Sequence, residues 1–95
     1  MRNNMILHVM YKTIDGKRED FIKEVEESKV LDTIRKEDGC ISYGYYLDAF
    51  DSNVILLVEE WGNKAKQQFH LTQEHMKTLS SIKNKYVLDT TVREF

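Results

Sequence analysis

Alternation of apolar and polar residues predicts four β-strands in this chain. In the first, Met5 to Thr13, both alternating sets are largely apolar, and the strand at 54–61 has the same character. A strand that is apolar on both sides usually lies in a sheet covered on both faces. Residues 41–50 alternate apolar with smaller or polar residues and are rich in strand-forming aromatics. Residues 87–95 form the last predicted strand.

Apolar residues at helical spacing predict helices between these strands. From Lys17 to Glu37 such residues recur with charges between them, and Gly39 supplies a C-terminal stop. A short helix is predicted over 63–69. Thr72 is a suitable N-cap for the helix that follows. The second helical region is therefore expected in two pieces.

The predicted order is β-α-β-β-α-β. This is the ferredoxin-like α+β arrangement, with a four-stranded antiparallel sheet and helices on one face. The other face would be exposed in a monomer, although the strands are apolar on both sides. A homodimer packed sheet to sheet would cover it. We therefore expect one domain over residues 1–95 that forms a dimeric α/β barrel through its sheet faces.

Composition narrows the functional classes. The chain has 14 Lys and Arg against 16 Asp and Glu, a net charge of −2, and no basic cluster, so no nucleic-acid partner is expected. The apolar runs are too short to span a bilayer, and the N-terminus shows no export signal. The single cysteine, Cys40, fits a reducing compartment. We expect a cytoplasmic protein without a membrane partner.

Candidate chemistry is concentrated between residues 59 and 76. Trp61 ends the third predicted strand, and His70 and His75 follow on either side of a helix junction at Thr72. One rigid apolar ring and two groups that can titrate near neutral pH could together wall a pocket. The spacing lacks the His-x3-His geometry of a helical zinc site, so no metal is expected.

Each candidate also has a structural explanation. His70 lies at a helix end, where the helix dipole alone favours a cationic imidazole. His75 could cap or pack at a helix start. His8 interrupts an apolar strand and is typical of a hydrogen-bonded interior or interface histidine. Strand tyrosines and a strand-end tryptophan are common core residues.

The chain resembles the antibiotic biosynthesis monooxygenase family over nearly its whole length, and within it the small quinol monooxygenases. The resemblance rests on the segment 35–40, RKEDGC, with Tyr43 following, on the pair Glu60-Trp61, and on the segment 70–76, HLTQEHM. Family members commonly have a Glu, any residue, Gly and Cys, and then a Tyr three positions on. They also commonly have a His, a short turn, and a second His that opens the next helix.

The resemblance implies a cofactor-independent monooxygenase that uses dioxygen as co-substrate and no metal, flavin or haem. A small phenol or quinol would be deprotonated in an apolar pocket and would pass an electron to dioxygen, after which the radical pair would recombine at carbon. His75 is the leading candidate for the base, with His70 beside it as the second catalytic residue. The substrate-binding candidates are Trp61, Phe69, Tyr43, Tyr45, Met76 and His8.

Departures from the family pattern narrow the range of substrates and reactions that the resemblance implies. The aromatic polyketide monooxygenases have an asparagine four residues before the strand-end tryptophan and a tyrosine six after it. Leu57 and Gln67 occupy those positions here, which disfavours a polycyclic antibiotic precursor. The haem-degrading relatives use an asparagine on the first strand, a tryptophan at the end of the short helix and a histidine in the next helix. Here the first two positions correspond to His8 or a neighbour and to His70, and the third has no clear counterpart. Haem degradation is therefore disfavoured, and the two histidines leave only weak haem binding open.

Two further functions remain open. One is a redox-neutral isomerase, as in the phospho-autoinducer isomerases that share this fold and a Phe-His…His segment like the one from Phe69 to His75. The other is a non-catalytic ligand-binding or stress-response module, which the altered polar set at Leu57 and Gln67 motivates.

Overall fold

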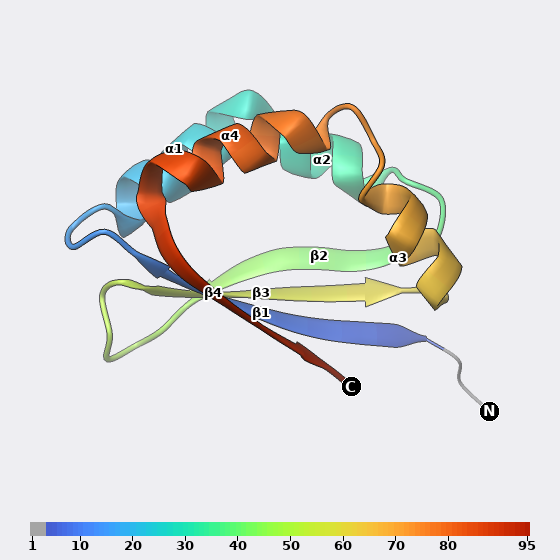
Figure 1. Cartoon of the computed structure of the whole chain (residues 1–95), viewed down its shortest axis with the longest axis horizontal. Coiled ribbons are helices and arrows are strands. Elements are labelled where there is room, and N and C mark those ends of the chain that lie inside the picture. The colour runs from blue at the N-terminus through green and yellow to red at the C-terminus, as the bar shows by residue number, and fades with distance from the viewer. Residues whose placement is uncertain (1–3) are drawn as a thin grey trace.

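The computed structural model describes residues 4–95. Its elements, in chain order, are β1 (Met5–Thr13), α1 (Arg18–Ser28), α2 (Val30–Arg35), β2 (Cys40–Leu47), β3 (Val54–Trp61), α3 (Lys64–His70), α4 (Met76–Tyr86) and β4 (Val87–Glu94). The strands form one antiparallel sheet in the order β2-β3-β1-β4. The helices of the described chain lie on one face of this sheet (Figure 1). The predicted ferredoxin-like α+β fold is confirmed.

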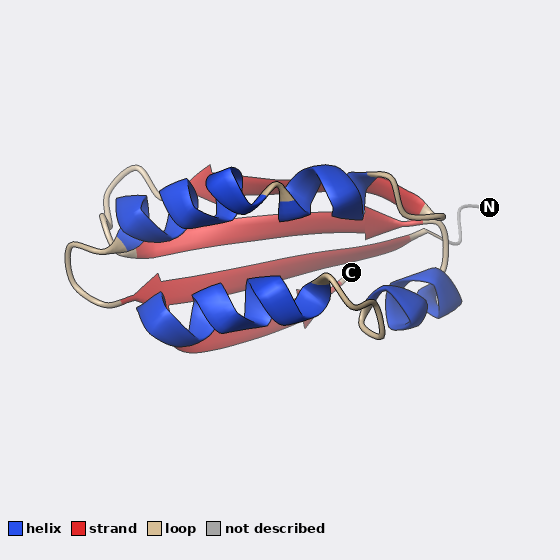
Figure 2. Cartoon of the chain, turned by 90° about the horizontal axis from the view of Figure 1, so that it is seen from above, coloured by secondary structure: helices blue, strands red, loops and turns tan. Residues whose placement is uncertain are grey.

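The helices form two rows over the sheet. Seen from above, α1 and α2 run along one side, and α4 and α3 along the other (Figure 2). Alternate residues of the strands point into the space beneath both rows, where Leu7, Val9 and Tyr11 of β1 are buried. The core also contains Phe21, Val25, Ile34, Ile55, Leu57, Trp61, Leu79 and Ile82.

The remaining alternate residues of the strands point to the opposite face of the sheet. His8, Leu56 and Val58 are partly exposed there, and Met10 is 48% exposed. No helix of residues 4–95 covers this face. No helix in the same range is long and apolar enough to cross a membrane.

Two helix boundaries differ from the predictions. The single helix predicted over 17–37 is two helices, because Lys29 adopts a left-handed conformation with φ 64° that ends α1 and precedes α2. The Ser28 hydroxyl supports this break by accepting a hydrogen bond from the Val30 N–H. The predicted N-cap at Thr72 is wrong. Its hydroxyl donates to the Phe69 carbonyl oxygen, and α4 begins at Met76 with His75 as its N-cap residue.

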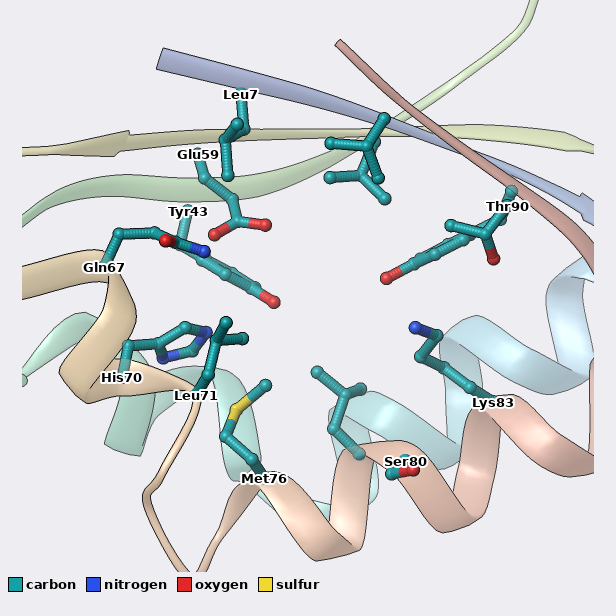
Figure 3. A pocket seen from close by; sticks show the side chains of 14 residues that line it. Leu7, Tyr43, Glu59, Gln67, His70, Leu71, Met76, Ser80, Lys83 and Thr90 are labelled. Carbon is teal, nitrogen blue, oxygen red and sulfur yellow. The ribbon is translucent and has the colours of Figure 1, made fainter. Parts of the chain in front are cut away.

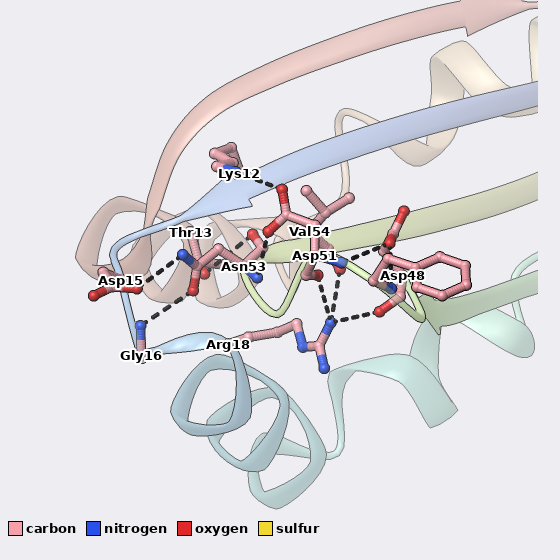
Figure 4. Close-up of polar contacts among 10 residues, drawn as sticks. Lys12, Thr13, Asp15, Gly16, Arg18, Asp48, Asp51, Asn53 and Val54 are labelled. Carbon is pink, nitrogen blue, oxygen red and sulfur yellow. Dashed lines mark hydrogen bonds and ion pairs between the residues drawn. The ribbon is translucent and has the colours of Figure 1, made fainter.

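The β2–β3 connection begins earlier than predicted. Strand β2 ends at Leu47 rather than at Phe50, because the Asp48 carboxylate accepts two backbone N–H groups of the following turn. The Arg18 guanidinium of α1 donates to three carbonyl oxygens around this turn, at 3.1 to 3.2 Å (Figure 4). These bonds fasten the hairpin to the start of the first helix row.

Candidate functional site

A cavity of about 270 Å³ lies between the inner face of the sheet and helices α3 and α4 (Figure 3). Mostly apolar walls with a few polar groups are the usual composition of a small-molecule pocket. The lining residues are Leu7, Val9, Tyr11, Tyr43, Glu59, Gln67, His70, Leu71, Met76, Leu79, Ser80, Lys83, Thr90 and Val92.

Helical periodicity explains which side chains reach this cavity. On α4, Met76, Leu79, Ser80 and Lys83 follow one another at intervals of three, one and three residues, and these positions share one face of a helix. On α3, Gln67 and His70 are three apart and also share a face. The two helices therefore present one continuous wall toward the sheet.

A single carboxylate oxygen joins the two histidines. Oε2 of Glu37 lies 2.9 Å from Nδ1 of His70 and 2.8 Å from Nε2 of His75. Because a carboxylate can only accept hydrogen bonds, both ring nitrogens donate. In the neutral form of the His70 ring, the proton then lies on Nδ1 and the lone pair on Nε2. His70 lines the cavity and is otherwise buried, with 1% of its surface exposed.

Glu37 is positioned by the tight loop between α2 and β2. Its N–H donates to the Ile34 carbonyl oxygen, and two residues later Gly39 adopts φ 88°. A Cβ atom at Gly39 would lie 2.5 Å from the Lys66 side chain of α3, so the loop can approach this closely only with glycine. This close approach brings the carboxylate of Glu37 to the end of α3.

Aromatic rings enclose the His70 imidazole. The Trp61 and His70 ring centroids are 4.6 Å apart with an interplanar angle of 37°, and Tyr43 meets the same imidazole edge-on at 5.7 Å. The Trp61 indole N–H donates to Oε1 of Glu59 at 3.0 Å. Burial raises the pKa of the Glu59 carboxyl, and the bond from Trp61 opposes that rise. The ring of His70 is thus held by packing on two sides and by Glu37.

Burial shifts the pKa values of titratable groups inside the cavity. Burial raises the pKa of both Tyr11 and Tyr43, so these residues remain neutral phenols near neutral pH. Burial lowers the pKa of the Lys83 ammonium, and the charge of Glu59 opposes that change. The amino nitrogen of Lys83 lies 4.9 Å from the centre of the Tyr11 ring.

Five of the predicted site residues are gathered at or beside the cavity. His70, Tyr43 and Met76 line it. His75 and Trp61 lie one layer behind, where His75 contacts Glu37 and Trp61 stacks on the His70 ring. Of the two histidines, it is therefore His70 that faces the cavity.

The other three predicted residues lie elsewhere. Tyr45 packs against Tyr11 and Phe21 in the core, outside the cavity lining. The Phe69 side chain is 63% exposed. His8 lies on the outer face of the sheet, where its ring contacts Phe95 with centroids 4.5 Å apart.

Sequence reasoning did not single out Glu37, Glu59 or Lys83 as site residues. Glu37 belongs to the segment 35–40, which supports the family resemblance, and this membership was the only sequence signal that pointed to it. Glu59 is one of the alternate residues of β3 that point toward the helices, so the alternation along this strand was its signal. Lys83 lies on the same face of α4 as Met76 and Leu79, so helical spacing was its signal.

One cluster has the composition of a metal site. Glu37, His70 and His75 each offer one ligand atom, and these atoms lie within 4.8 Å of one another. Two imidazoles and a carboxylate are ligands that zinc accepts. The two hydrogen bonds to Glu37 already account for the arrangement of these side chains.

Known proteins resemble the chain in sequence and in structure. A family model described as antibiotic biosynthesis monooxygenase matches residues 4–80. The probable quinol monooxygenase YgiN of Escherichia coli is 31% identical over 70% of this chain and 71% of its own length. An uncharacterized Synechocystis protein is 37% identical over 62% of this chain, and the match spans only 39% of that protein. A solved structure from Pseudomonas aeruginosa superposes with a TM-score of 0.85 at 21% identity, covering 100% of this chain and 94% of the other.

Proposed function

Because the chain belongs to the antibiotic biosynthesis monooxygenase family, we propose that it oxidises a small phenol or quinol with dioxygen, without a metal, flavin or haem. The observation that carries this proposal is the pairing of Glu37 with His70 beside an apolar cavity. Glu37 holds a proton on Nδ1 of His70, so Nε2 is free to accept a proton from a ligand in the cavity. An imidazole oriented in this way is the usual general base near neutral pH.

In the first step, Nε2 of His70 takes the proton of a substrate hydroxyl. The electron-rich anion that remains passes one electron to dioxygen, which becomes superoxide while the ring becomes a radical. The imidazolium formed on His70 is stabilised by the adjacent Glu37 carboxylate. Neutral phenol groups such as that of Tyr43, which points into the cavity (Figure 3), could donate a hydrogen bond to the substrate oxygen.

In the second step, superoxide and the ring radical combine to form a carbon–oxygen bond. The peroxide takes the proton held by His70 and becomes a hydroperoxide. Loss of the proton from the same carbon then breaks the oxygen–oxygen bond, leaving a carbonyl on the ring and releasing water. The substrate gains one oxygen atom and loses two hydrogens, and the second oxygen atom leaves as water. No external reductant is needed.

This assignment gives His70 the role of base and places His75 behind Glu37. His75 donates to the same carboxylate oxygen, and its side chain is 23% exposed. It therefore orients Glu37 from the side away from the cavity. Trp61 and Tyr43 keep the imidazole ring in place.

A homodimer is part of the same proposal. The outer face of the sheet carries Met10 on β1 and Leu56 and Val58 on the neighbouring strand β3, and Met10 and Leu56 are register partners. Packing this face against a second copy would bury apolar side chains that the helices leave uncovered, in an isologous interface. The two cavities would remain on the far sides of the sheets.

A redox-neutral isomerase is the second candidate, because the same base could move a proton within a bound metabolite without using oxygen. A non-catalytic ligand-binding module is the third. Oxygen uptake by metal-free protein separates the three, measured with reduced menadione, naphthols and simple quinols and corrected for spontaneous oxidation. Protein-dependent uptake supports the monooxygenase. Proton exchange without uptake would favour the isomerase, and tight binding without any product would favour the binding module.

A further inference from the structure

Lys83 brings a positive charge into the cavity from α4. Figure 3 shows its amino group pointing into the cavity from the side opposite His70. The side chain is half-buried, and Lys83 forms no ion pair within the described residues 4–95. Among the lining residues of this described part, it is the one lysine or arginine.

The protein compensates this charge only in part. The amino nitrogen lies 4.9 Å from the centre of the Tyr11 ring, a cation–π contact. The carboxylate of Glu59 raises the pKa of Lys83, while burial, the larger influence, lowers it. Glu59 is itself engaged by the Trp61 indole N–H. A partly buried ammonium without a contacting anion is costly, so an anionic ligand group would be stabilised beside it.

The polar groups of the cavity are divided between its two sides. Glu59, Gln67 and His70 lie on one side, and Lys83, Ser80 and Thr90 on the other (Figure 3). A single ammonium matches one negative charge, whereas a phosphate is usually bound by several cationic or backbone donors. The volume of about 270 Å³ suits a ligand of one or two rings.

We propose that Lys83 is an anion subsite and that the substrate is a small aromatic carboxylate, with its carboxylate at Lys83 and its reacting hydroxyl at His70. This inference rests on the proposed function, since it names the substrate class of the same cavity. Lys83 is then a specificity-determining residue, and the distance across the cavity sets which ring hydroxyl meets the base.

The test uses two quinols that match in size and differ in charge. Gentisate carries a carboxylate beside its quinol ring, and gentisamide carries a neutral amide in the same place. Their binding to the intact protein is measured by anaerobic titration calorimetry, with wild type, Lys83→Met and Lys83→Arg. Lys77→Met is the control, because Lys77 is an exposed lysine on the same helix that does not line the cavity.

Wild type and Lys77→Met are expected to bind gentisate at least about tenfold more tightly than gentisamide, the size of a charge-assisted hydrogen bond. Lys83→Met should abolish this preference, and Lys83→Arg should retain it. Equal binding of the two ligands by wild type, binding of neither, or a preference that persists in Lys83→Met would overturn the proposal. Oxygen uptake with neutral quinols would then still support the monooxygenase function, so the two failures can be told apart.

Discussion

Glu37 and His70 are separated by 33 residues in the chain, yet a 2.9 Å hydrogen bond joins Oε2 of one to Nδ1 of the other. The glutamate comes from the loop after α2 and the histidine from the end of α3. This bond orients the one histidine that lines the cavity. The proposed reaction therefore depends on how closely that loop approaches α3.

Replacing the carboxylate with an amide tests this dependence. In Glu37→Gln the amide nitrogen can donate to the histidine, which would leave Nδ1 unprotonated and place the proton on Nε2, facing the cavity. We expect kcat to fall about 100-fold with little change in KM, the scale of a lost general base. Steady-state oxygen uptake measures it, with Asp32→Asn as the control because Asp32 is an exposed carboxylate on the neighbouring helix α2. An unchanged kcat would remove Glu37 from the mechanism.

The two histidines should differ in their effects. His70→Gln removes the nitrogen that faces the cavity, so kcat is expected to fall by about 100-fold or more. His75→Gln leaves that nitrogen in place and should cost about tenfold or less. The two variants are compared by turnover of one active quinol, with thermal unfolding as a check on folding. The reverse order of effects would return the role of base to His75.

Glu59 predicts a pH-dependent stability. Since burial raises the pKa of Glu59 above its ordinary 4.5, the folded state binds this proton more tightly than the unfolded state does. The free energy of unfolding therefore decreases as pH rises from 4.5, the ordinary pKa, to the raised pKa of the folded state, and the decrease is complete above that raised pKa.

Glu59→Gln removes the charge and keeps an oxygen for the Trp61 N–H. The variant should be more stable than wild type at neutral pH and should lose this advantage below pH 4.5. Urea unfolding at both pH values measures the difference. A constant difference across the range would show that ionisation of Glu59 does not destabilise the fold.

The proposed dimer makes Leu56 an interface residue. A lysine there would place a charge in the centre of the apolar outer face, so Leu56→Lys should convert a dimer to a monomer in sedimentation velocity. Thr78→Lys on the exposed side of α4 is the control and should leave the mass unchanged. A monomeric wild type would refute the dimer. A Leu56→Lys variant that remains dimeric would show that the dimer forms through another surface.

The hydrophobic pattern predicted the order of elements well, because alternation and helical spacing are local properties. It missed the break at Lys29, since a lysine in the left-handed conformation has no sequence signal comparable to glycine. Phe69 and His70 were both expected at the pocket. Adjacent helical residues point about 100° apart, so only one of the two can face it.

The candidate site was only partly predictable for a different reason. His70, Tyr43 and Met76 were identified through their type and spacing, and they do line the cavity. The partner that orients His70 comes from a loop 33 residues away, and single-sequence patterns carry no information on such long-range pairing. Glu37 was visible only as part of a family motif.

The most direct test of the monooxygenase account is the mass of the product formed from an active quinol under isotopically labelled dioxygen. The account predicts that metal-free wild-type protein forms a product with one labelled oxygen atom and two fewer hydrogens, with the second labelled atom in water. His70→Gln should form this product at about one hundredth of the rate or less. A product without label, or labelled product formed equally fast by His70→Gln, would contradict the account.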